Sequence, residues 1–186
     1  MTSFADFSIL FVAIFSLLQF LFPLVGNKVN MKNLNYIVSF FSISSFVLLT
    51  VSFSILILAY VNSDFSLLNV WSNSHTSKPL IYKISGSWGN HEGSMLLWCW
   101  VMSLYGFLVA INFQKISSNF KIRILMFQGI LSFGFITFLK FKSNPFEKLF
   151  PIPEEGIGLN PLLQDPGLAF HPPFLYLGYV GLSIVW

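Results

Sequence analysis

Residues 37–61 read IVSFFSISSFVLLTVSFSILILAYV, and they lie inside a longer stretch, Asn33 to Ser63, that carries no charged side chain. A helix needs about 20 apolar residues to cross the roughly 30 Å hydrocarbon core of a bilayer. The stretch therefore predicts a membrane-spanning helix at residues 36–61, and its length favours a tilted helix. Its serines can bond back to backbone carbonyls of the same helix or across to a neighbouring helix.

The composition of the whole chain agrees with a membrane location. Of its 186 residues, 55% are hydrophobic, only 9% are charged, and 23 are Phe. Soluble domains carry about 25% charged residues, because a water-exposed surface needs ionisable side chains. The net charge of +3 is small, and the Lys and Arg residues are scattered rather than gathered in a stripe. The composition thus excludes a soluble domain, a disordered chain and a nucleic-acid-binding module.

Four further apolar stretches predict membrane-spanning helices. The fourth span is short between charges, but Lys140 and Lys142 can extend their side chains to the interface. Residues 143–173 hold seven of the nine prolines, so they cannot form a regular helix in lipid. We therefore predict an all-α, polytopic integral membrane bundle of about five transmembrane helices, with two long loops at residues 62–93 and 143–167. The five spans are expected at residues 4–25, 36–61, 94–113, 122–142 and 168–186.

The orientation of the chain follows from its loops. An odd number of spans places the two long loops on one side of the membrane and the two short turns on the other. Lys and Arg are equally numerous on the two sides, so the positive-inside rule does not decide by number. The short turns carry their positive charges more densely, so we expect them to face the cytoplasm or matrix. The long loops are expected to face outward, and all three His lie in them or at the adjoining start of the fifth span.

The first segment with candidate chemistry is residues 87–98, SWGNHEGSMLLW, where the first long loop enters the third span. We expect Ser94 to cap this helix. Trp88 can lie at headgroup depth or offer a flat apolar face to a planar ligand, and headgroup depth is the commoner role of a single Trp. His91 beside Glu92 is a candidate ligand, a switch or a hydrogen-bonded loop residue, and the last is the commonest.

His171 lies in the second such segment, residues 153–173, directly before Pro172 and Pro173. A residue before proline favours extended backbone, and proline favours the first position of a helix. We therefore expect Pro172 to open a helix and His171 to stand at its N-terminus. The positive end of the helix dipole disfavours imidazolium, and neutral imidazole is the form that binds haem iron. His171 is thus a candidate axial ligand, and the alternative is a capping or hydrogen-bonded interfacial His.

Other catalytic or cofactor motifs are missing from the sequence. It holds no phosphate-binding glycine loop, no HExxH zinc motif and no recognisable Ser-His-Asp set. Its single cysteine excludes an internal disulfide and a CxxC metal or redox motif. No charged residue falls in the middle of a predicted span, which argues against an ion pump or transporter. We therefore assign no catalytic residue.

Two strings resemble motifs of the CcmF family of cytochrome c maturation haem lyase subunits, which includes the paralogue NrfE. They are WGNHEGS at residues 88–94 and LNPLLQDPGLAFHPP at residues 159–173. The resemblance covers only the N-terminal portion of the family. It implies a multi-pass protein of the bacterial inner (cytoplasmic) membrane, or of the mitochondrial inner membrane if the chain is organelle-encoded.

The resemblance also implies a cofactor site. Members of the family hold b-type haem in transit between two outward-facing His, and His171 occupies the first of these positions. His171 would therefore bind a metal only as an axial ligand of the haem iron. We add Trp88, His91 and Pro172 as haem-pocket or loop-ordering residues.

The resemblance implies partners as well. The family takes haem from the chaperone CcmE and joins its vinyl groups to the thiols of apocytochrome c, which CcmH/CcmI-type subunits present at the membrane lipid surface. The chain ends before the family's Trp-rich WWD domain, its second outward His and its intramembrane His pair. We therefore expect a haem lyase subunit that is incomplete on its own, with a separate chain carrying the WWD domain where the family is split between genes. The alternatives are a transporter, a respiratory-complex subunit and an inactive fragment.

Overall fold

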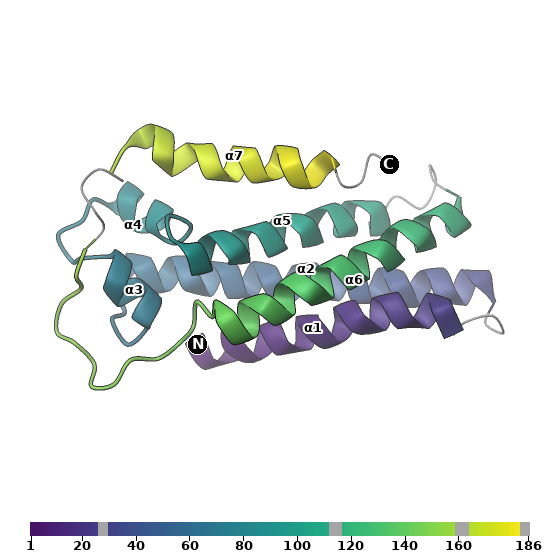
Figure 1. Ribbon diagram of the computed structural model, residues 1–186, viewed down its shortest axis with the longest axis horizontal. Coiled ribbons are helices and arrows are strands. Elements are labelled where there is room, and N and C mark those ends of the chain that lie inside the picture. Colours follow the sequence, from purple (N-terminus) through teal and green to yellow (C-terminus); the bar gives the residue numbers. More distant parts are fainter. Residues whose placement is uncertain (26–29, 112–116, 159–163, 183–186) are drawn as a thin grey trace.

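The computed structural model describes residues 1–25, 30–111, 117–158 and 164–182. Most of these residues are helical, and they contain no β-sheet, only one isolated bridge between Leu67 and Lys148. The predicted all-α fold is confirmed. The helices are α1 (Thr2–Val25), α2 (Met31–Val61), α3 (Leu68–Asn73), α4 (Leu80–Gly86), α5 (His91–Ile111), α6 (Ser118–Lys142) and α7 (Pro166–Leu182) (Figure 1).

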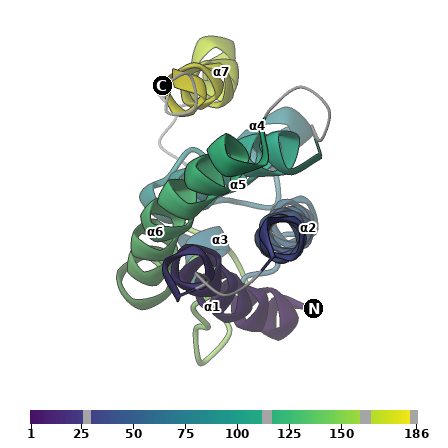
Figure 2. The same cartoon turned by 90° about the vertical axis from the view of Figure 1, so that its right-hand side faces the viewer.

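Four of these helices, α1, α2, α5 and α6, are long and apolar enough to cross a membrane. They run side by side as a bundle, and α7 lies on the outer face of α5, away from α1 (Figures 1 and 2). The described part of α7 has 17 residues, and residues 183–186 of the span predicted at 168–186 lie outside the described residues. Helix α6 begins at Ser118, earlier than the predicted start at residue 122.

The first long loop is more regular than predicted. Residues 62–93 contain α3 and α4, and α5 already begins at His91. Both short helices lie at the end of the bundle where the N-terminus also lies (Figure 1). In the second long loop, the described residues 143–158 and 164–165 form no helix, and the loop leaves α6 at the same end. The two predicted outward loops are therefore on the same side of the bundle.

Inside the bundle, small and aliphatic side chains face the neighbouring helices while many Phe side chains face outward, as expected where lipid replaces water. The serines of α2 behave as predicted. Ser52 Oγ donates to the carbonyl oxygen of Leu48 at 2.9 Å and lies 3.3 Å from that of Ala5 in α1. The largest fully buried aliphatic side chains include Ile9, Leu49, Leu56, Leu96, Leu125, Ile136 and Leu139.

An ion pair closes the bundle at the end that carries the long loops. The Lys140 ammonium lies 2.5 Å from the Asp6 carboxylate, and both side chains are largely buried. Asn144 Nδ2 donates to the same carboxylate oxygen at 2.8 Å. The contact joins the first turns of α1 to the last turn of α6.

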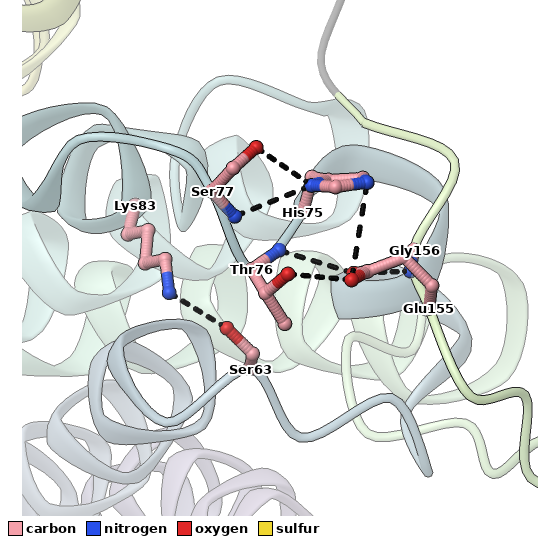
Figure 3. Close-up of polar contacts among 7 residues, drawn as sticks. All are labelled: Ser63, His75, Thr76, Ser77, Lys83, Glu155 and Gly156. Atoms are coloured by element: carbon pink, nitrogen blue, oxygen red, sulfur yellow. Dashed lines mark hydrogen bonds and ion pairs between the residues drawn. The ribbon is translucent and has the colours of Figure 1, made fainter.

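The two long loops are hydrogen-bonded to each other. Glu155 Oε1 accepts from the backbone N–H of Thr76 at 3.0 Å, and Glu155 Oε2 accepts from the Thr76 hydroxyl at 2.5 Å (Figure 3). A Cβ atom at Gly156 would lie 2.0 Å from the carbonyl oxygen of Ser74, so only glycine fits there. The Thr76 hydroxyl, followed by the Gly156 N–H, holds the pKa of Glu155 at about 2, below its ordinary 4.5. His75 Nε2 adds a contact at 3.9 Å.

Candidate functional site

The start of α5 is fixed by Asn90. Its Oδ1 accepts from the backbone N–H of Gly93 at 2.8 Å, which is the bond an N-cap residue makes three positions ahead. The prediction that Ser94 caps the helix is wrong. Ser94 lies inside the first turn and its hydroxyl donates to the carbonyl oxygen of Trp88 at 2.6 Å. Asn and Ser cap about equally well, so residue type does not choose between them. Asn90 is the cap because α5 begins at His91, the next residue.

Asn90 is also the centre of a buried polar network. Its Nδ2 donates to the Tyr60 hydroxyl at 2.9 Å and to the Gly86 carbonyl oxygen at 2.8 Å. Its Oδ1 accepts from Asn69 Nδ2 at 2.8 Å, and Asn69 Nδ2 also lies 3.2 Å from Glu92 Oε2. One amide therefore uses both donors and both lone pairs. This role was not predicted from the sequence, although an Asn directly before an apolar helical stretch is an N-cap signal.

The second glycine of the WGNHEGS string allows a close backbone contact. A Cβ atom at Gly93 would lie 1.8 Å from the carbonyl oxygen of Ser87. Backbone cannot yield as the end of a flexible side chain can, so the position requires glycine. The string therefore folds into a compact turn that delivers the Trp88 side chain to one side of α5.

Trp88 joins this turn to α7. Its indole Nε1 donates to the carbonyl oxygen of Ala169 at 2.9 Å. In a regular helix this carbonyl would accept from the N–H of residue 173, but Pro173 has none. The indole of Trp88 supplies the missing donor, while its ring packs against Phe53 of α2 with the centroids 6.3 Å apart. The two motif segments are thus in direct contact.

Two further contacts hold α7 on α5. The Tyr105 hydroxyl donates to the carbonyl oxygen of Leu177 at 2.7 Å. The Trp98 and Tyr176 rings meet edge to face with their centroids 5.2 Å apart. A Cβ atom at Gly181 would lie 2.7 Å from the Tyr105 hydroxyl oxygen, so a glycine makes room for this tyrosine. One face of α7 therefore packs against α5.

His171 lies within α7, past its first turn, and not at its N-terminus. The helix begins at Pro166, and Ala169 N–H donates to the carbonyl oxygen of Asp165 at 3.0 Å. The predictions that Pro172 opens the helix and that His171 stands at its N-terminus are wrong, because an earlier proline takes the first position. The helix dipole acts mainly on the first turn, so it no longer argues for a neutral imidazole. Pro172 is half-buried inside the helix.

The His171 side chain is exposed and forms no hydrogen bond or ion pair with another described residue. It lies two positions after Ala169, which corresponds to about 200° around a helix, so it faces away from α5. Phe170 and Phe174 beside it are more than half exposed. The imidazole is therefore free to bind a ligand and has apolar neighbours. The Trp88 side chain reaches the opposite, α5-facing side of the same segment.

His91 points in another direction. Its Nδ1 lies 2.8 Å from Ser143 Oγ at the end of α6, and its ring meets Phe138 edge to face with the centroids 6.2 Å apart. The structure thus brings Trp88 to the segment of His171 but keeps His91 on the α6 side. No group of three His, Cys, Asp or Glu side chains in the described residues could hold a metal ion. In this part of the chain, His171 would bind iron as a single protein ligand.

Comparisons with known proteins agree with the two motifs. The family described as Cytochrome C assembly protein matches residues 88–186. The cytochrome c-type biogenesis protein ccl1 of Rhodobacter capsulatus is 44% identical over 97% of this chain and 28% of its own length. The cytochrome c-type biogenesis protein CcmF of Escherichia coli is 49% identical over 73% of this chain and 21% of its own.

A solved structure shares the fold. The cytochrome c haem lyase CcmF superposes with a TM-score of 0.71 over 98% of this chain and 27% of that chain, at 24% identity. The chain therefore spans about a quarter of the length of the relatives it matches. The resemblance that the two motifs indicate is confirmed by the family match and by the identity to curated relatives. The chain belongs to the cytochrome c assembly protein family.

Proposed function

We propose that this chain acts in cytochrome c maturation, as the part of a membrane haem lyase that binds haem and presents it to apocytochrome c. The observation that carries the proposal is the hydrogen bond from Trp88 to Ala169, because it joins the two family motifs beside an exposed histidine. Several relatives are named cytochrome c-type biogenesis proteins. The chain supplies about a quarter of their length, so the proposal concerns one part of the machinery.

His171 is the proposed axial ligand of the haem iron. Its imidazole is exposed and has no competing partner among the described residues. Imidazole nitrogen is a common ligand of haem iron, and apolar surface beside it suits a porphyrin ring. Phe170 and Phe174 supply such surface. The second axial ligand would come from outside the described residues or from a partner. We assign Trp88 and Pro172 to ordering the ligand segment, and His91 to ordering the junction of α5 and α6.

The chemistry asked of this chain is binding and positioning. In thioether formation a cysteine S–H would add across a haem vinyl group, so the S–H bond and the vinyl π bond break while one C–S and one C–H bond form. The reactivity belongs to the porphyrin and the thiol. A ligand that holds the iron leaves the haem only rotation about the iron–nitrogen bond, which apolar surface beside the ring can restrict. Holding two reactants in place raises their effective concentration. No residue of this chain is therefore proposed as a general acid or base.

The proposed partners follow from this role. Haem would arrive from a CcmE-type chaperone as b-type haem in transit and leave on apocytochrome c that CcmH/CcmI-type subunits present. A separate chain with the WWD domain is a further proposed partner. The proposed location is the bacterial inner membrane, or the mitochondrial inner membrane for an organelle-encoded chain, with residues 62–93 and 143–167 facing outward.

The test is replacement of His171 by Ala in cells whose own family gene is deleted. We expect haem-stained cytochrome c to disappear while the amount of the variant protein in the membrane stays normal. His75→Ala is the matched control, because His75 is another solvent-accessible His at the loop-bearing end but lies against Glu155. Normal maturation with His171→Ala would remove His171 from the mechanism. A topology reporter fused at position 171 that locates this position on the cytoplasmic or matrix side of the membrane would contradict the proposed orientation.

A further inference from the structure

A small cavity lies between the four long helices, within the part of the bundle that spans the membrane. The volume within which the centre of a water molecule can lie is about 10 Å³. Its lining is unusually polar for the interior of a membrane bundle, since hydroxyl and amide side chains reach it from α1, α2, α5 and α6. The polar lining residues are Ser16, Gln19, Ser42, Ser45, Ser103, Gln128 and Ser132.

Two oxygen atoms of this lining have no hydrogen-bond partner among the described residues. They are Gln128 Oε1 and Ser45 Oγ, and both atoms are fully buried. The exposed fraction of the side chains is 7% for Gln128 and 5% for Ser45. The amide of Gln128 is nevertheless held in place, because its Nε2 donates to the carbonyl oxygen of Met102 at 2.5 Å. Its carbonyl oxygen is thus fixed and left unpaired.

The geometry at Gly106 shows that polar atoms converge here. A Cβ atom on Gly106 would lie 2.5 Å from Gln128 Oε1 and 2.8 Å from Ser42 Oγ. The oxygens of two helices, α6 and α2, therefore approach the same point on α5. A serine hydroxyl can donate and accept, whereas an amide oxygen only accepts. A shared molecule with two donors and two acceptors would complement this set.

We propose that the cavity binds one water molecule that donates to Gln128 Oε1 and to Ser45 Oγ. A cavity needs about 10–15 Å³ of this kind of space to hold one water, and the void reaches that limit. Cavities that stay empty are apolar, whereas this one is lined with hydroxyls and amides. An unpaired amide oxygen is costly in a membrane interior, because no bulk water can reach it. The water would link α2 to α6 in the middle of the bundle.

The experiment is water-edited solid-state NMR on the full-length protein in lipid bilayers, with glutamine side chains labelled with ¹⁵N. The Gln128 amide signal is assigned as the one lost in Gln128→Met. We expect this signal to receive magnetisation from water at short mixing times although the side chain is buried. A Gln128 amide that receives none in the unsubstituted protein would show a dry cavity and overturn the proposal.

A pair of matched variants tests the assignment of the water to these residues. Ser39 and Ser45 both lie in α2, and each has a buried Oγ without a partner among the described residues, but only Ser45 lines the cavity. Ser45→Ala is expected to reduce the water transfer to Gln128 several-fold, and Ser39→Ala is expected to leave it unchanged. Equal effects of the two substitutions, or no effect of Ser45→Ala, would overturn the proposal.

Discussion

The indole Nε1 of Trp88 lies 2.9 Å from the carbonyl oxygen of Ala169, the oxygen that Pro173 leaves without a backbone donor. Two prolines inside a helix would ordinarily kink or break it, because each removes a hydrogen bond. Here a side chain from a distant part of the sequence replaces one of the lost donors. The Trp-Gly segment and the His-Pro-Pro segment therefore depend on each other physically.

This relationship predicts the effect of Trp88→Phe. The ring is kept, but Ala169 is buried and its carbonyl would be left unpaired, which costs about 1–3 kcal/mol. Hydrogen–deuterium exchange should speed up in residues 164–182, and cytochrome c maturation should fall. Trp100→Phe is the control, because Trp100 donates to Thr50 of α2 and forms no hydrogen bond or ring contact with the described residues of α7. Equally fast exchange of residues 164–182 in both variants would contradict the proposed role.

A second substitution should rescue the first. Pro173→Ala restores a backbone N–H that can donate to the Ala169 carbonyl oxygen, so it removes the need for the indole donor. We expect Trp88→Phe to destabilise α7 strongly in the presence of Pro173 and weakly in the presence of Ala at that position. A double-mutant cycle on the stability of the detergent-solubilised protein measures this coupling. Additive effects would show that the two residues act independently.

Asn90→Asp should separate the two roles of Asn90. An Asp side chain can still cap α5 by accepting from Gly93, but it cannot donate to Tyr60 or Gly86. Loss of a cap alone costs about 1 kcal/mol. Loss of the amide donor to the buried Tyr60 hydroxyl, and to a Gly86 carbonyl oxygen that keeps only the Gly89 N–H at 3.3 Å, adds to that cost. We therefore expect Asn90→Asp to lower thermal stability almost as much as Asn90→Ala. Wild-type stability of Asn90→Asp would mean that only the cap matters.

Gly93→Ala should disrupt the same turn for a steric reason. The added methyl would lie 1.8 Å from the Ser87 carbonyl oxygen, so the backbone must move, at a cost of about 1–3 kcal/mol or more. Gly134→Ala is the matched control, because nothing lies within 4 Å of its Cβ position and it lies inside α6. It should be neutral or raise the melting temperature slightly. Equal melting temperatures for the two variants would refute the steric argument.

The lowered pKa of Glu155 predicts that the contact between the two long loops depends on pH. The pKa of its carboxyl is lowered from 4.5 to about 2 in the folded chain, first by the Thr76 hydroxyl. A lowered acid pKa contributes stability that is complete above pH 4.5 and is lost as the pH falls toward 2. Thr76→Val should raise the pKa, measured by the ¹³C shift of the Glu155 carboxyl. An unchanged titration midpoint in Thr76→Val would show that the hydroxyl is not the main cause.

Much of the fold follows from local sequence. Long stretches without charge must cross the bilayer as helices, because only a helix satisfies its own backbone in lipid. The Pro-rich residues 143–165 are excluded from that role by the same physics. The two motif strings were enough to indicate the family. Residues 153–173, however, contain five prolines, each of which can stand at the start of a helix, and local preference alone did not select Pro166 over Pro172.

The site depended on contacts between distant residues. The sequence alone determined that the chain is a helical membrane bundle and that His171 lies beside a loop-bearing end. Only the tertiary structure decided that Asn90 caps α5, that His91 faces α6, and that His171 lies within α7 facing away from α5. The reason is that the position of each of these side chains depends on hydrogen-bonding and packing partners that tertiary contacts bring close. Trp88 completes the hydrogen bonding of a helix 81 residues away in the chain, and no local pattern encodes that partner.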